Sequence, residues 1–142
     1  MISETVKIFE KNWKQYDEWF ESYKTIYQSE IKALKKIIPS GRGLEIGIGT
    51  GRFASPLSVQ FGLDPSFNML KLARDRNIEV VQGLGEDLPF KNESFHFVLI
   101  VVTIGFVHNP LRVLKEAART VKKNGVFILG IIDNKESMGE IL

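Results

Sequence analysis

Three glycines at alternating positions follow a short apolar run, in residues 44–51 (LEIGIGTG). Glycines there let the backbone turn sharply and approach a ligand closely, at the N-terminal end of the following helix. A second candidate, Asp64, ends the next apolar run, where a carboxylate can accept hydrogen bonds from both hydroxyls of a ribose. Taken alone, the segment Asp64-Pro65-Ser66 would indicate only the start of a helix. Together with the glycine loop, it predicts a nucleoside-binding site.

The spacing and charge around the loop distinguish between two kinds of nucleoside. A dinucleotide fingerprint is G-x-G-x-x-G, whereas this loop is G-x-G-x-G and Arg52 occupies the place of the third glycine. Glu45 stands two residues before the first glycine; its carboxylate would repel a pyrophosphate but tolerate an ammonium or a sulfonium. The pattern of a P-loop is missing from the sequence. A cationic nucleoside is therefore favoured, with a nicotinamide-dependent oxidoreductase as the weaker alternative.

Strand and helix patterns alternate along the chain and must position these residues. Helical spacing runs from Thr5 to Ile38 and ends at Pro39. Strands are expected at residues 43–48, 59–63, 78–82, 95–102 and 126–132. The fourth is continuously apolar, as is typical of a strand buried on both faces of a parallel sheet. The alternation predicts an α/β parallel sheet with right-handed crossovers.

Two helices have recognisable first residues. Ser66 is the expected N-cap of a helix through Arg76, with Phe67, Leu70 and Ala73 along one side. Asn109 followed by Pro110 begins another helix, which is expected to end at Asn124-Gly125. Its expected buried stripe comprises Leu111, Leu114, Ala118 and Val121.

Composition bounds the remaining function classes. A length of 142 residues allows one domain, and a net charge of +2 with interspersed signs argues against a nucleic-acid partner. The absence of cysteine and the presence of only two histidines leave little for a metal site, so none is expected. The sequence shows no signal peptide and no apolar run long enough for a membrane helix. We therefore expect a cytoplasmic protein with no membrane partner.

Four segments in order resemble the class I S-adenosylmethionine-dependent methyltransferases, in particular their small-molecule subgroup (UbiE/BioC-like, methyltransferase type 11). Residues 44–51 resemble the first motif of this family, and residues 62–70 (GLDPSFNML) resemble the second. Residues 83–95 are similar to the adenine loop and the entry to strand four, and residues 111–125 to the helix before strand five. Residues 16–20 (YDEWF) are similar to an N-terminal element of some members.

The resemblance implies a Rossmann-like, doubly wound parallel sheet with strand order 3-2-1-4-5 and S-adenosylmethionine as cofactor. Glu45 and the backbone of Gly47 and Gly49 are expected to line the methionine part, and Val102 to contact its amino group. Asp64 is expected to hold the ribose, and the other implied cofactor-binding residues are Tyr16, Pro65, Met69, Gly85 and Glu86. For Tyr16, Trp19 and Phe20, a lid over the cofactor and a helix packed on the core are equally favoured.

The sequence also departs from the family pattern. Leu84 stands where the subgroup usually has an aspartate in the adenine loop, and residues 104–106 (IGF) replace a frequent histidine pair. His96 begins strand four, at the end opposite the cofactor crevice, and is interpreted as structural. His108 lies on the crevice side but is interpreted as a solvated loop residue, so no catalytic residue is assigned. The first hypothesis is methyl transfer to a small-molecule acceptor, and the second is a cofactor-binding protein of the same fold without catalysis.

The length sharpens the family interpretation. The family's sheet has seven strands, and this chain provides five, so the sixth and seventh are missing. We expect an N-terminal helical segment or lid at 1–40, a cofactor-binding core at 41–132, and the start of a truncated C-terminal region at 133–142. Truncation is favoured over an unusually short member or a homodimer that pairs through the exposed edge of strand five.

Overall fold

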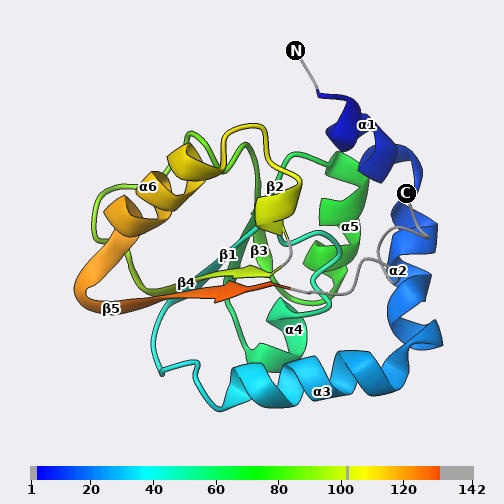
Figure 1. Cartoon of the computed structure of the whole chain (residues 1–142), viewed down its shortest axis with the longest axis horizontal. Coiled ribbons are helices and arrows are strands. Elements are labelled where there is room, and N and C mark those ends of the chain that lie inside the picture. Colours follow the sequence, from blue (N-terminus) through cyan, green and yellow to red (C-terminus); the bar gives the residue numbers. More distant parts are fainter. Residues whose placement is uncertain (1–2, 102, 132–142) are drawn as a thin grey trace.

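The computed structural model describes residues 3–101 and 103–131 and contains one five-stranded parallel sheet (Figure 1). The strands are β1 (Gly43–Ile46), β2 (Phe61–Asp64), β3 (Glu79–Gln82), β4 (Phe95–Val101) and β5 (Val121–Gly130). Their order is β3-β2-β1-β4-β5, and every neighbouring pair is parallel. The predicted Rossmann-like sheet and its strand order are confirmed.

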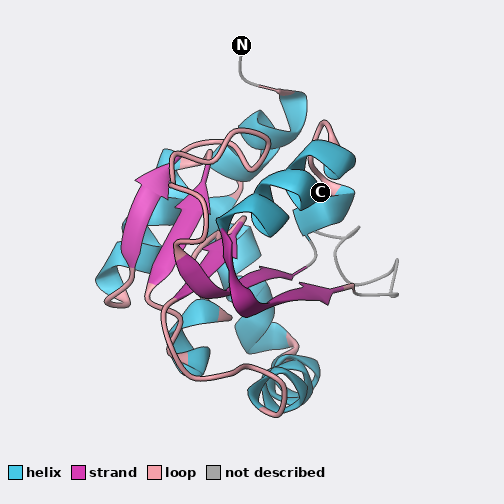
Figure 2. Ribbon diagram, turned by 90° about the vertical axis from the view of Figure 1, so that its left-hand side faces the viewer, coloured by secondary structure: helices cyan, strands magenta, loops and turns pink. Residues whose placement is uncertain are grey.

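Helices cover both faces of the sheet (Figure 2). They are α1 (Glu4–Lys11), α2 (Trp13–Ser22), α3 (Lys24–Lys35), α4 (Ala54–Leu57), α5 (Phe67–Asp75) and α6 (Pro110–Thr120), with a 3₁₀ turn, η1 (Thr103–Gly105). One hydrophobic cluster joins α2, α3, α4 and α5 to the sheet, and a second joins α6 to the opposite face. Among the described residues, no helix is long and apolar enough to span a bilayer.

Strand β4 is the centre of both clusters. All of its residues except His96 are buried, because both of its faces are covered by helices. Phe97 and Leu99 face one cluster, and Val98 and Ile100 face the other. This confirms the interpretation of its continuous apolar pattern.

The predicted end of the last helix is wrong. Helix α6 ends at Thr120, where the expectation was Asn124-Gly125, and β5 begins at Val121. The chain leaves the helix early because the Ser94 amide donates to the Thr120 carbonyl (2.8 Å) and Val121 pairs with Phe95 at the start of β4. A turn-like sequence thus becomes the first part of a strand, with a register shift between Phe95 and Phe97.

The buried faces of two helices also differ from the prediction. On α6 the buried residues are Val113, Ala117 and Thr120, whereas Leu111 is 62% exposed. On α5 the buried residues are Met69, Leu70 and Ala73, whereas Phe67 is exposed. The helix starts are as predicted: Ser66 accepts from the Met69 amide, and Asn109 accepts from the Arg112 amide.

The N-terminal segment consists of three helices. They are separated at Asn12 and Tyr23, whose backbone does not continue the helical geometry. Trp19 and Phe20 of α2 and Ile31 and Leu34 of α3 belong to the main hydrophobic cluster. Helix α1 has no buried residue and lies against α5 (Figure 1).

Candidate cofactor site

A cavity of about 1010 Å³ opens at the carboxyl ends of the strands. This is the edge at which parallel α/β sheets bind their ligands. Eight of the ten predicted cofactor-binding residues line it together: Tyr16, Gly47, Gly49, Asp64, Pro65, Met69, Gly85 and Glu86. Val102 lies outside the described residues, although its neighbour Val101 lines the cavity.

The glycine loop adopts a backbone that other residues rarely adopt. Gly47 and Gly49 have φ values of 73° and 57°. A Cβ atom at Gly47 would lie 2.2 Å from the Thr103 side chain, whose hydroxyl donates to the Gly47 carbonyl. A Cβ atom at Gly49 would approach the ring of Tyr16 at 3.2 Å. The loop is therefore enclosed by Thr103 on one side and by α2 on the other.

Asp64 is held in place by the backbone. Its Oδ2 accepts from the Gly49 amide and its Oδ1 from the Ser66 amide, both at 2.9 Å. Burial raises the pKa of Asp64 to about 6, against the opposing effect of these two amides. Each carboxylate oxygen has a further lone pair, so the group can still accept hydrogen bonds from a bound ligand.

Among the predicted cofactor-binding residues that the structure describes, Glu45 is the one that does not line the cavity. Its side chain is 1% exposed, and its Oε1 has no hydrogen-bond partner within the described part of the chain. Burial, followed by the charge of Asp64, raises the pKa of Glu45 well above its usual range, against the amide of Ala54. A buried carboxyl oxygen without a partner is costly, and a donor such as an ammonium group would satisfy it. A direct contact between Glu45 and the cofactor stays a prediction.

Two of the N-terminal aromatic residues lie in the core, and the third reaches the cavity; a lid over the cofactor stays a prediction. Trp19 and Phe20 are core residues, 5% and 2% exposed. Tyr16 packs against that core and also lines the cavity, with its ring 5.8 Å from that of Phe9 in α1. Burial, followed by the nearby carboxylates of Glu45 and Asp64, raises the pKa of Tyr16 above its usual range, so the phenol stays neutral.

An ion network that the sequence did not reveal joins α2 to the glycine loop and to α5. Asp17 accepts from Arg52 Nε and from Arg76 Nη1, both at 2.9 Å. Arg76 also donates to the Thr50 carbonyl at 2.6 Å. Burial works to raise the pKa of Asp17, but the bonds from Arg76 and Arg52 hold it well below its usual range. The one available signal was Arg52, in a position where a dinucleotide-binding loop has glycine.

The far wall of the cavity comes from the segments around Glu86 and α6. The Asn109 amide donates to Glu86 Oε2 (3.2 Å), and Arg112 Nε donates to the Glu86 carbonyl (2.9 Å). His108 lines the cavity and is exposed, and Leu84, 53% exposed, lines it where the family usually has an aspartate. His96 lies at the opposite end of β4 and accepts from the Arg42 amide at 2.8 Å, which is a structural role.

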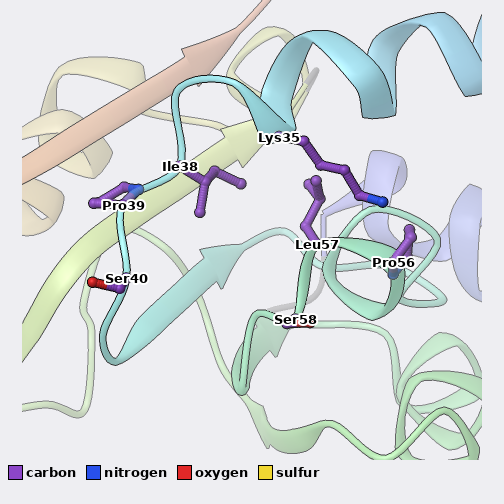
Figure 3. Close-up of a pocket in the computed structure, with 7 residues that line it drawn as sticks. All are labelled: Lys35, Ile38, Pro39, Ser40, Pro56, Leu57 and Ser58. Atoms are coloured by element: carbon purple, nitrogen blue, oxygen red, sulfur yellow. The ribbon is translucent and has the colours of Figure 1, made fainter.

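A second hollow of about 380 Å³ lies between the end of α3 and the α4 region (Figure 3). Its lining residues are Lys35, Ile38, Pro39, Ser40, Pro56, Leu57 and Ser58. None of the predicted site residues is among them. The cavity at the strand ends is therefore the candidate site.

A model of the methyltransferase domain family matches residues 44–129, more than half of the chain. The chain belongs to the class I S-adenosylmethionine-dependent methyltransferases. It is 48% identical to an uncharacterised protein of Methanocaldococcus jannaschii over 96% of the chain and 66% of the relative. It is also 31% identical to the demethylmenaquinone methyltransferase of Bacillus licheniformis, over 83% of the chain and 58% of that enzyme.

A solved structure shows the same relationship. The chain is 49% identical, with a TM-score of 0.88, to an S-adenosylmethionine-dependent methyltransferase of Thermotoga maritima described as a possible histamine N-methyltransferase. The match covers 92% of this chain and 62% of that one. The chain thus spans about two thirds or less of the length of these relatives.

Proposed function

We propose that the chain binds S-adenosylmethionine in the cavity at the strand ends and transfers its methyl group to a small-molecule acceptor. The observation that carries this proposal is Asp64, whose buried carboxylate is aimed at the cavity by the amides of Gly49 and Ser66. The glycine loop also fits the close approach of a nucleoside, and the unpartnered Oε1 of Glu45, which does not itself line the cavity, would accept from an ammonium group. The family to which the chain belongs uses this cofactor.

The residues assigned to the site would bind and orient the cofactor. The bound cofactor supplies an activated methyl group on a good leaving group, so in-line displacement requires alignment above all. Asp64 would hold the ribose, Met69 and the segment at Gly85 would hold the adenine, and Tyr16 would cover the loop side. A neutral Tyr16 and the apolar residues of the wall would limit the access of water to the reacting atoms.

The acceptor would occupy the part of the cavity that α1 and the segment after β4 line together. The apolar residues there are Val6, Phe9, Phe106 and Val107, and the rings of Phe9 and Phe106 pack edge-to-face. The named relatives support a small-molecule acceptor, because their names denote a quinone precursor and an amine.

Calorimetric titration with S-adenosylmethionine, its demethylated product and NAD tests the cofactor. We expect binding of the first two, and an affinity loss of about 1–3 kcal/mol in Asp64→Ala, the cost of a lost hydrogen bond to a charged group. The matched control is Asp75→Ala, which removes an exposed carboxylate at the end of α5 and should bind normally. Tight NAD binding without a response to S-adenosylmethionine would refute the proposal.

Transfer is tested by incubating the protein with methyl-labelled cofactor and a cell extract. We expect label in the low-molecular-mass fraction after ultrafiltration. Label confined to macromolecules would contradict a small-molecule acceptor. Binding with no transferred label would instead favour a cofactor-binding protein without catalysis.

A further inference from the structure

Helix α1 contributes to the cavity without being part of the core. Ser3, at its N-cap, and Thr5, Val6 and Phe9 line the cavity, yet the helix has no buried residue. Its apolar contacts include edge-to-face packing of Phe9 on Phe106 at 5.5 Å. Burial of apolar area therefore provides little of the energy that holds this wall in place.

Glu10 supplies a specific attachment for α1. Its Oε2 accepts from the Ser66 hydroxyl at 2.5 Å, and its Oε1 accepts from the Asn68 amide at 3.1 Å. The Asn68 side chain in turn donates to the Glu10 carbonyl at 3.0 Å. The carboxylate thus lies at the N-terminus of α5, where the helix dipole favours negative charge.

The attachment point is also part of the candidate cofactor site. Ser66 donates its hydroxyl to Glu10 and its backbone amide to Asp64 Oδ1. Asp64 Oδ2 accepts from the Gly49 amide in the glycine loop. One residue, Ser66, therefore separates the carboxylate that holds α1 from the carboxylate proposed to hold the ribose.

We propose that Glu10 is a positioning residue that couples the docking of α1 to cofactor binding. This inference rests on the proposed function. The hydrogen bonds of Glu10 fix the turn that carries Asp64 and hold α1 against α5. Docking of α1 therefore favours the arrangement of Asp64 that binds the cofactor. Because such coupling is reciprocal, a bound cofactor must also stabilise docked α1. The acceptor site, which uses Val6 and Phe9, is then completed only on the cofactor-bound protein.

Hydrogen exchange of the chain with and without the demethylated cofactor tests this coupling. In the unaltered protein we expect the ligand to slow exchange of the α1 backbone amides. In Glu10→Ala we expect a cofactor affinity about five- to tenfold lower, about the effect of one ordinary hydrogen bond, because Glu10 acts on the site through Ser66. We also expect the ligand-dependent protection of α1 to disappear, while protection around β1 and β2 remains. A general loss of stability would change the exchange rates measured without ligand. It would not abolish the slowing of α1 exchange that the ligand causes.

Glu4→Ala is the matched control on the same helix. Its side chain is 86% exposed, and its carboxylate pairs with Lys7 at 3.3 Å, so we expect native affinity and native protection. Glu10→Gln keeps one oxygen that can accept from Ser66. Its cofactor affinity and its protection of α1 should therefore lie between those of Glu10→Ala and Glu4→Ala. The inference fails if Glu10→Ala binds the cofactor with native affinity and retains protection of α1. If the unaltered chain does not bind the cofactor at all, the proposed function fails first and this inference fails with it.

Discussion

Helix α1 and the pair α2–α3 belong to one stretch of sequence but are held by different forces. Helices α2 and α3 place Trp19, Phe20, Ile31 and Leu34 in the main hydrophobic cluster. Helix α1 has no buried residue and is attached through Glu10 and the ring of Phe9. A continuous helical pattern in the sequence therefore covers two parts, one belonging to the core and the other to the wall of the cavity.

Helices α1 and α2 are each linked to the candidate site through a carboxylate. Asp17 of α2 binds two arginines, one from the glycine loop and one from the end of α5. Glu10 of α1 binds the opposite end of α5. The difference lies in what surrounds each carboxylate: Asp17 lies beside a packed aromatic core, and Glu10 does not. Substitutions in each part should therefore differ in kind, with α2 and α3 affecting stability and α1 affecting ligand binding.

The largest difference is expected between two phenylalanines. Phe20 is 2% exposed and contacts the rings of Tyr16, Trp19, Tyr27 and Phe53. Phe20→Ala should lower the free energy of unfolding by about 3–4 kcal/mol, because it leaves a cavity in this cluster. Phe9→Ala should lower it by less than about 1 kcal/mol, since Phe9 is only partly covered. Urea denaturation measures both, and equal losses would contradict the division between α1 and α2.

Asp17→Asn tests the tie between α2 and the glycine loop. It leaves Arg52 and Arg76 close together without their shared counter-charge, so we expect a loss of about 2–3 kcal/mol at pH 7. The pKa of Asp17 is lower in the folded than in the unfolded protein, so its contribution is full above pH 4 and declines as the pH falls further. Denaturation at several pH values should therefore show the difference from the unaltered protein shrinking in acid. A pH-independent difference would show that the charge is not the cause; Asp75→Asn is the exposed control.

Glu30→Gln should stabilise α3. Burial raises the pKa of Glu30 to about 6, and its Oε2 has no partner among the described residues. Since the folded pKa exceeds the unfolded value of 4.5, the ionised form is penalised above pH 6 and the penalty disappears below pH 4.5. After allowance for its partial exposure, we expect a gain of about 0.5–1 kcal/mol at pH 8 and none at pH 4. A thermal melt measures this, with the exposed Glu18→Gln as control, and destabilisation at pH 8 would contradict it.

The parts that the sequence predicted well are those whose pattern is set by burial on a regular element. The continuously apolar run predicted β4, which is buried in the structure. The predicted ends of β1 and β2 correctly placed Gly47 and Asp64 at one edge of the sheet. Contacts between side chains far apart in sequence left no local pattern. Glu10 and Asn68 are an example, and the link between Asp17 and Arg76 is another.

The end of α6 was mispredicted for a related reason. The residues after Thr120 resemble a helix terminus, but hydrogen bonds from the start of β4 draw them into the sheet. The division of the chain at residue 40 and a homodimer through β5 stay predictions. The apolar side chains exposed on β5, including Val126, Phe127 and Leu129, lie at the edge strand that this interface would use.

The smallest effect is expected from His108, on the cavity wall opposite α1. His108 is exposed on the segment between η1 and α6, so its imidazole is solvated. We expect His108→Ala to change the S-adenosylmethionine affinity by less than about twofold, which is within the cost of losing a solvated contact. Calorimetry beside Glu10→Ala makes the comparison direct, because both residues lie outside the glycine loop but only Glu10 is linked to Asp64. A larger loss of affinity in His108→Ala than in Glu10→Ala would contradict this comparison. It would show that cofactor binding depends more on the cavity wall at α6 than on the wall at α1.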